Sequence, residues 1–270
     1  MKKLLIIIGI IAVAIGVGLG AQNSLPGDML HSVKVGITEN IGKLFAFSQA
    51  GKISRSETRE IRRLSEDEQL SIANRMTSDS AKKIQDEFKK QTASLTSAVG
   101  SGETQKELQI TAEKNAEFEG KLHAHIDILN FLQAQKTEQA ESLTPIIDEV
   151  RSAINSATQA RIQAETKILG GERTETEARD DADSAQKIAE TVLTDAKQIL
   201  DTQAPTDEAS RAEAEAQLHS AQDHMADGKT RFDAKSYGGA FVSFQQALRS
   251  AQEVSERVST LKSLNISLSQ

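Results

Sequence analysis

Histidines and closely spaced carboxylates are the residues of this sequence with the chemistry to bind a metal ion. His123, His125 and Asp127 lie in one short segment, and imidazole nitrogens and carboxylate oxygens are ligands that zinc accepts. On a helix, residues two apart point to nearly opposite sides, so one ion does not easily reach both histidines. His123 and Asp127 share a face but supply only two ligands. These three residues are therefore weak ligand candidates, and we predict neither a metal nor a cofactor.

The remaining clusters are less suited to a ligand. His219 and His224 are five residues apart and diverge on a helix, even with Asp223 between them. The run Asp180-Asp181-x-Asp183 lacks the spacing and the glycine of a calcium-binding loop, so a solvated acidic helix face is the better interpretation.

No pattern of an established catalytic site occurs in the sequence. It contains no phosphate-binding loop, no Gly-x-Ser-x-Gly and no His-Glu-x-x-His. Gly170-Gly171 and Gly238-Gly239 fall between expected helices, whereas a dinucleotide-binding glycine loop follows a strand. We predict that the protein is not an enzyme and has no catalytic residues.

The composition predicts the elements that would have to position any site. The chain has 270 residues with only 3% aromatic residues, three prolines and no cysteine. Strands favour aromatic and β-branched residues, whereas this sequence is rich in good helix formers. We predict an all-α fold, an elongated bundle of long antiparallel helices with a C-terminal helical hairpin, preceded by an apolar leader helix.

The charge balance argues against nucleic acid as a partner. The net charge is −7, and nucleic-acid binding needs a concentrated positive surface. The basic residues at 59–63, 82–83 and 89–90 are interleaved with acidic or amide residues. A solvated helix face is the favoured interpretation of each cluster.

The segment 1–21 predicts export from the cytoplasm. Two lysines precede an unbroken apolar run from Leu4 to Leu19, which is the order of an export signal. Gly18 and Gly20 suit cleavage before Ala21, but residues 4–21 as a helix would measure about 27 Å, close to the thickness of a membrane core. Both a cleaved signal peptide and a retained membrane anchor stay open. We expect the protein at the outer face of the cytoplasmic membrane, in the periplasm or at the cell surface.

Apolar periodicity predicts six helical regions after the leader. A first helix is expected over 29–45, a second over 54–99 and a third over 103–142. Thr144-Pro145 resembles a helix start, because Thr caps helices and Pro is tolerated in the first turn. The expected domains are 22–143 (N-terminal helical domain), 144–203 (helical hairpin) and 206–270 (C-terminal helical hairpin).

A short motif directly follows the leader. Its residues Pro26, Gly27, Asp28, Leu30, Val33 and Lys34 fit the pattern Pro-Gly-Asp-x-Leu-x-x-Val-Lys. Pro fixes φ and Gly permits an unusual backbone angle, so the pair can turn the chain into the first helix. We interpret the motif as structural, with a docking site for a partner as the alternative.

The motif resembles the opening of a family of exported bacterial all-helical proteins of unknown function. In that family, long helices with a Leu-x-x-His segment follow, and Leu122 and His125 hold a similar place here. His31 stands where the family often has Tyr. The resemblance implies a helical fold and an exported location, and it implies no activity.

The C-terminal pair of helices is similar to a single tetratricopeptide-like repeat. Gly228, Tyr237, Ala240, Phe244 and Ala247 fit its spacing. The match is partial and no second copy is visible, so a terminal hairpin that packs on the bundle is the favoured interpretation.

We therefore expect a non-enzymatic extracytoplasmic protein that acts by protein–protein or envelope interaction. Its partners would be another protein, a second copy through helix faces, or the membrane through residues 4–21. The alternative is a ligand-binding or sensing module that works with a separate membrane protein. That alternative requires polar residues in the apolar stripes, such as His125 and Asn115, to meet in space.

Overall fold

The protein is all-α, as the composition predicts. The computed structural model describes residues 49–99, 104–205 and 207–266, and within these ranges it contains helices and no strand. The helices are α4 (Gln49–Ile72), α5 (Ser78–Val99), α6 (Gln105–Gln135), the 3₁₀-helix η2 (Thr137–Gln139), α7 (Ala140–Gly170), α8 (Glu175–Gln203), α9 (Glu208–Asp233) and α10 (Tyr237–Leu264). The leader, the helix expected over 29–45 and the motif from Pro26 to Lys34 lie outside the described residues.

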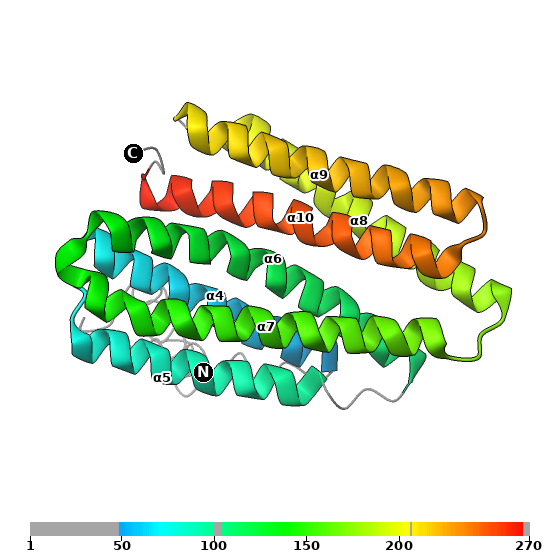
Figure 1. Ribbon diagram of the computed structural model, residues 1–270, viewed down its shortest axis with the longest axis horizontal. Coiled ribbons are helices and arrows are strands. Elements are labelled where there is room, and N and C mark those ends of the chain that lie inside the picture. The colour runs from blue at the N-terminus through cyan, green and yellow to red at the C-terminus, as the bar shows by residue number, and fades with distance from the viewer. Residues whose placement is uncertain (1–48, 100–103, 206, 267–270) are drawn as a thin grey trace, which may run out of the picture.

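Helices α4 to α7 pack together as one group, with α6 and α7 side by side along most of their length (Figure 1). Each helix contributes one apolar face to a shared core, as the stripes in the sequence predict. The main core residues are Leu64, Leu70, Ile84, Phe88, Phe118, Leu122, Ile128, Leu129, Leu143, Ile147 and Val150.

The single helix expected over 54–99 is wrong, because the chain turns back between α4 and α5. Asn74 has φ of 53°, in the left-handed region that Asn tolerates better than most residues. The amide of Asn74 bonds to the carbonyl of Ser71 and the amide of Arg75 to that of Leu70, the pattern that closes many helix C-termini. Thr77 and Ser80 then cap each other's backbone amides as α5 begins. The apolar stripe continues across this turn, so periodicity alone does not reveal it.

The expected end of the third helix at 142 and the expected helix start at Thr144-Pro145 are also wrong, because α6 ends at Gln135 and α7 begins at Ala140 and contains Pro145. Proline lacks the amide that an internal helical position donates. Side chains hold the turn before it instead: the Thr144 hydroxyl donates to the Ala140 carbonyl and accepts from the Gln133 side-chain amide, each over 2.9 Å.

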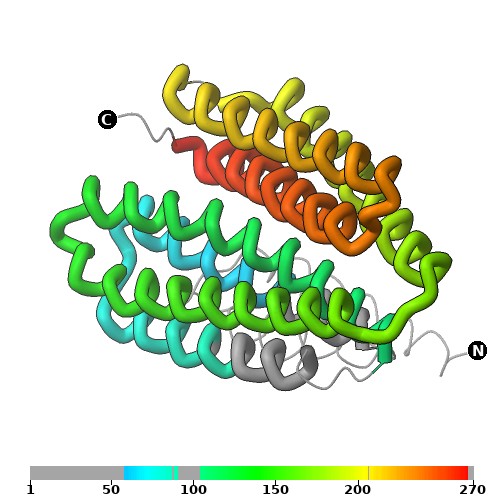
Figure 2. The backbone as a smooth tube through the Cα atoms, turned by 45° about the vertical axis from the view of Figure 1, so that its right-hand side comes forward, coloured from blue at the N-terminus to red at the C-terminus, as the bar shows by residue number. Residues whose placement is uncertain are grey.

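Helices α8, α9 and α10 form a second group that lies against α6 through α10 (Figure 2). Although α7 and α8 are consecutive in the chain, α7 packs on α6 and α5, whereas α8 packs on α10 and α9. Within the described residues, α7 therefore lies with the preceding helices and α8 with the following ones. Alanines line much of the second group's core, so its helices approach closely.

Within the described ranges, no helix combines the length and apolar character needed to cross a membrane.

Candidate functional site

Among the described residues, buried charged side chains occur along α4 and where α10 meets α6. Helices α6 and α10 approach so closely at Gly120 that a Cβ there would lie 2.5 Å from the Arg249 carbonyl oxygen. On either side of this point, charged residues of α6 face charged residues of α10, α4, α7 and α9. We call these contacts the ionic seam; its members are Glu68, Glu119, His125, Asp127, Arg161, Glu165, Glu213, Arg249, Glu253, Glu256 and Arg257.

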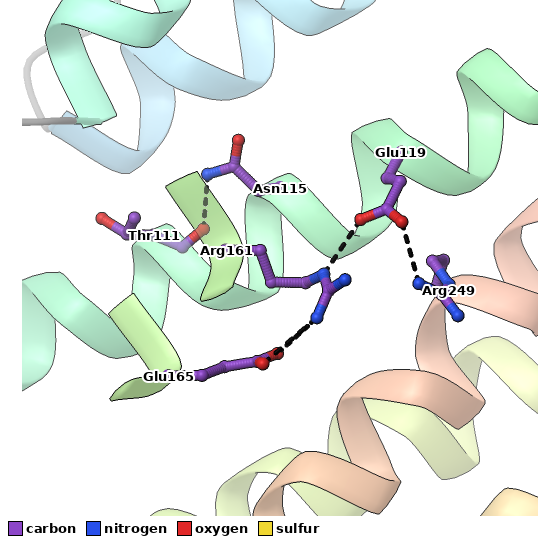
Figure 3. A network of polar contacts seen from close by, with 6 residues as sticks. All are labelled: Thr111, Asn115, Glu119, Arg161, Glu165 and Arg249. Carbon is purple, nitrogen blue, oxygen red and sulfur yellow. Dashed lines mark hydrogen bonds and ion pairs between the residues drawn. The ribbon is translucent and has the colours of Figure 1, made fainter. Parts of the chain in front are cut away.

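At one end of the seam, the Glu119 carboxylate joins three helices (Figure 3). One oxygen accepts from Arg161 Nε of α7 at 2.9 Å, and the other accepts from Arg249 Nη1 of α10 at 2.8 Å. Arg161 also pairs with Glu165 on its own helix at 3.0 Å. Burial alone would raise the pKa of Glu119, but its two arginine partners outweigh burial and lower it. Glu119 is therefore ionised at neutral pH.

In the middle of the seam, the His125 ring lies between two carboxylates. Its Nδ1 is 2.7 Å from Glu68 Oε1 of α4, and its Nε2 is 3.4 Å from Glu256 Oε1 of α10. The second distance is long for a hydrogen bond, so we describe that contact as an ion pair. Burial alone would lower the pKa of His125, but the two carboxylates raise it to about 10. The imidazole is therefore a cation that links α4, α6 and α10.

At the other end, Arg257 of α10 connects α6 with α9. The guanidinium contacts Asp127 of α6 and Glu213 of α9, the latter at 2.7 Å, and only 4% of the arginine side chain is exposed. Glu253, one turn earlier on α10, accepts from the Gln217 side-chain amide of α9 at 2.7 Å. Burial raises the pKa of Asp127 despite the neighbouring arginine.

The seam fixes how the two groups of helices align. Glu119 and Asp127 are eight residues apart on α6, and their partners Arg249 and Arg257 are eight apart on α10. Sliding one helix along the other by a turn would leave buried charges without partners, which costs several kcal/mol per ion. A buried ion pair contributes little net stability compared with an apolar pair. The role of the seam is therefore to fix the alignment of α6 with α10.

Asp67 of α4 differs from the other buried charged groups. It is fully buried, and neither carboxyl oxygen has a hydrogen-bond partner among the described residues. Burial and the neighbouring Glu68 raise the pKa of Asp67 well above its ordinary value, and Arg63 opposes them only in part. A buried polar group without a partner is costly, and such groups often occur at functional sites.

The three weak ligand candidates point to different neighbours. His125 faces Glu68 and Glu256, and Asp127 pairs with Arg257. His123 is half-buried near the charges of Glu119 and Asp127, and burial lowers its pKa. Among the described residues, no group of three or more His, Asp or Glu side chains is placed to hold a metal ion.

Sequence reasoning did not single out the residues that form most of the seam. The sequence did contain a sign that Arg161 is buried. Arg161 lies four residues after Ala157 and three before Ala164, which is a core position in the apolar stripe of this helix. Arg257 likewise lies beside Val258 on the inward face of α10. A charged residue at an inward position implies a buried partner, but the sequence does not identify which one.

Comparisons with protein-family models, with curated proteins and with solved structures gave no match to this chain.

Proposed function

We propose that this chain is a non-enzymatic helical protein of the cell envelope that acts by binding a protein, a second copy of itself or an envelope surface. The observation that carries the proposal is the pairing of charges in the ionic seam. Each end of the seam joins helices through matched arginine and carboxylate groups, which suits a rigid scaffold. A scaffold of this kind leaves the outer faces of its helices for binding.

A second observation supports the same proposal. Asn115 donates to the Thr111 carbonyl of its own helix at 2.7 Å, whereas His125 faces α4 and α10 (Figure 3 shows Asn115). These two polar residues of the α6 stripe therefore do not converge on a common point. Convergent polar groups in a cleft are what a catalytic site requires.

The finer features of the proposal come from the sequence. They are an elongated antiparallel bundle, a leader at 1–21 that exports the chain and either is cleaved or anchors it, and a location outside the cytoplasmic membrane. Membership of the exported helical family with the motif at 26–34, and the likeness of the last two helices to a single tetratricopeptide-like repeat, belong to the same proposal.

Light scattering coupled to size-exclusion chromatography tests this function. The full chain in detergent would be run alone and after mixing with a detergent extract of its source membrane. A defined complex that a variant with charge reversals on an outer helix face fails to form supports binding to a partner. A stable dimer that the extract does not change supports self-association. A monomer that binds neither itself nor any component, and that turns over a substrate, would overturn the proposal.

Asp67 favours a second candidate function, a ligand-binding or sensing module. Among the described residues its buried carboxyl has no hydrogen-bond partner, and a ligand could supply one; such a carboxyl lowers stability until it is paired. Because its pKa is raised in the folded state, its contribution to stability is fully present below the unfolded pKa and is lost as pH rises through the folded pKa.

The variant Asp67→Asn separates these two functions. If the carboxyl is kept for a ligand, the variant gains roughly 1–3 kcal/mol of unfolding free energy at pH 8 and little at pH 4, measured by urea denaturation. The exposed Asp195→Asn on α8 is the control and should change stability by less than about 0.5 kcal/mol. A loss of stability at both pH values would assign Asp67 a structural role.

A further inference from the structure

Four lysines lie exposed on the outer face of α5. Lys82 and Lys83 are followed at a spacing of seven by Lys89 and Lys90, so all four share one side of the helix. None of them has an ion-pair partner among the described residues, in contrast to Lys114, Lys187 and Lys229 elsewhere in the chain. Asp79 and Asp86 lie on the same side and Glu87 follows directly in the sequence, so α5 carries four lysines against three carboxylates, an excess of one positive charge.

Helix α5, which carries these lysines, lies on the far side of the molecule from the acidic helices α8 and α9 (Figure 1). Helix α5 packs against α4 and α7 and forms one edge of the first group, whereas α8 and α9 form the opposite edge (Figure 1). Acidic residues outnumber basic ones across 172–266. An anionic surface would therefore attract the α5 edge and repel the α8–α9 edge, which defines one orientation for the whole molecule.

We propose that the lysine face of α5 docks on an anionic phospholipid surface and holds the helical body against the membrane. This inference rests on the proposed envelope location. Each lysine near an anionic leaflet contributes only a modest attraction, so the face would bind weakly alone. A retained leader would raise its effective concentration at the bilayer, and two weak signals together give stable attachment.

Lysine reactivity in vesicles tests the docking. The full chain would be mixed with vesicles of phosphatidylcholine alone, or of phosphatidylcholine and phosphatidylglycerol in equal parts, and acetylated with a water-soluble reagent. With phosphatidylglycerol, we expect Lys82, Lys83, Lys89 and Lys90 to react at least about fivefold more slowly. Lys187 and Lys197 of α8 should be unchanged. About 1 M salt, which shortens the screening length to about 3 Å, should abolish the protection.

A pair of variants makes the test specific. Lys82→Gln with Lys89→Gln leaves Lys83 and Lys90 as reporters, and their protection should fall to nearly none. Lys187→Gln with Lys197→Gln changes the charge equally and should keep the protection intact. Equal acetylation rates in the two kinds of vesicle, or equal protection of every lysine, would overturn the docking.

Vesicle flotation separates the two proposals. A chain that floats with both kinds of vesicle but shows no protected lysines contradicts the lysine face and leaves the envelope location standing. Flotation only with phosphatidylglycerol supports the lysine face and contradicts the leader as an anchor. Flotation with neither contradicts both the lysine face and the leader as a retained anchor.

Discussion

His125 shows how one side chain determines the contact among three helices. Its ring is fully buried, and each nitrogen faces a carboxylate from a different helix. A neutral imidazole would offset the charge of neither carboxylate, whereas the imidazolium hydrogen-bonds to Glu68 and forms an ion pair with Glu256. Buried carboxylates are stable only when a partner offsets their desolvation, so His125 and its two neighbours depend on one another.

We expect His125→Gln to lower the free energy of unfolding by roughly 3–5 kcal/mol at pH 7, because it removes the cation that is hydrogen-bonded to the fully buried Glu68. Urea denaturation followed by circular dichroism measures this loss. His219→Gln is the control, since His219 is exposed on α9 and pairs only with exposed Asp223. An equal effect of the two substitutions would contradict the role of His125 in the seam.

The same residue predicts a dependence on pH. The folded pKa of His125 is raised to about 10, above the ordinary value of 6.5. Its contribution to stability is therefore fully present below about pH 6.5 and is lost as pH rises through about 10. The difference in unfolding free energy between the wild type and His125→Gln should shrink across that window. A difference that stays constant from pH 6 to pH 10 would show that the ring is not charged in the folded protein.

At the scale of elements, the α4–α5 turn depends on Asn74. Its backbone adopts a left-handed conformation, and its side-chain oxygen accepts from Lys136 at 3.0 Å and from Gln139 at 3.1 Å. The residue thus ends α4 and also attaches this turn to the connection between α6 and α7. The Asn74 side chain, together with a hydrogen bond from the Gln139 side-chain amide to the Ser71 carbonyl at 3.3 Å, joins the two hairpins of the first group at one end.

We expect Asn74→Ala to cost about 2 kcal/mol of unfolding free energy, because alanine is strained at positive φ and cannot accept the two hydrogen bonds. Asn74→Gly should cost only about 1 kcal/mol, since glycine adopts this backbone freely and loses only the side-chain contacts. Thermal or urea denaturation compares the two. If both variants were as stable as the wild type, the turn would not depend on this residue.

At the scale of the whole molecule, the two groups of helices meet where α6 has no side chain. A Cβ at Gly120 would lie 2.5 Å from the Arg249 carbonyl oxygen and 3.1 Å from the Glu253 amide nitrogen, both backbone atoms of α10. Backbone cannot rotate aside as a side chain can, so α10 would have to move as a unit. The neighbouring pairs of the ionic seam would then lengthen together.

We therefore predict that Gly120→Ala destabilises the protein by roughly 1–3 kcal/mol, despite the better helix propensity of alanine. Gly170→Ala is the matched control, because a Cβ there meets nothing within 4 Å, and it should be neutral or slightly stabilising. Hydrogen exchange should show faster opening of α10 in Gly120→Ala alone. Unchanged exchange in α10 would mean that the two groups do not depend on this close contact.

The amino-acid sequence was enough to indicate the fold class, but among the helix boundaries it predicted, the turn between α4 and α5 is missing and the expected end at 142 and start at Thr144 are wrong. Composition excludes a strand-rich fold, and boundary signals such as Thr104 with Glu107 and Thr174 with Glu177 act through local hydrogen bonds that each segment makes alone. The periodicity did not predict the turn at Asn74, because the apolar stripe is unbroken there and only the backbone angle of one residue marks the turn. Pro145 wrongly indicated a helix start. It is tolerated inside α7 because of the 3₁₀ turn and the side-chain hydrogen bonds that precede it.

Only the tertiary structure decided which helices pack on one another and which charges pair. Glu119 and Arg249 are 130 residues apart in the chain, and nothing local to either indicates the other. The apolar stripe on α7 indicates which face is buried but not which helices cover it, and that choice depends on the shapes and charges of all the faces together. Periodicity is a property of one segment, whereas pairing is a property of two surfaces, and so the ionic seam became visible only when α6 and α10 were brought into contact.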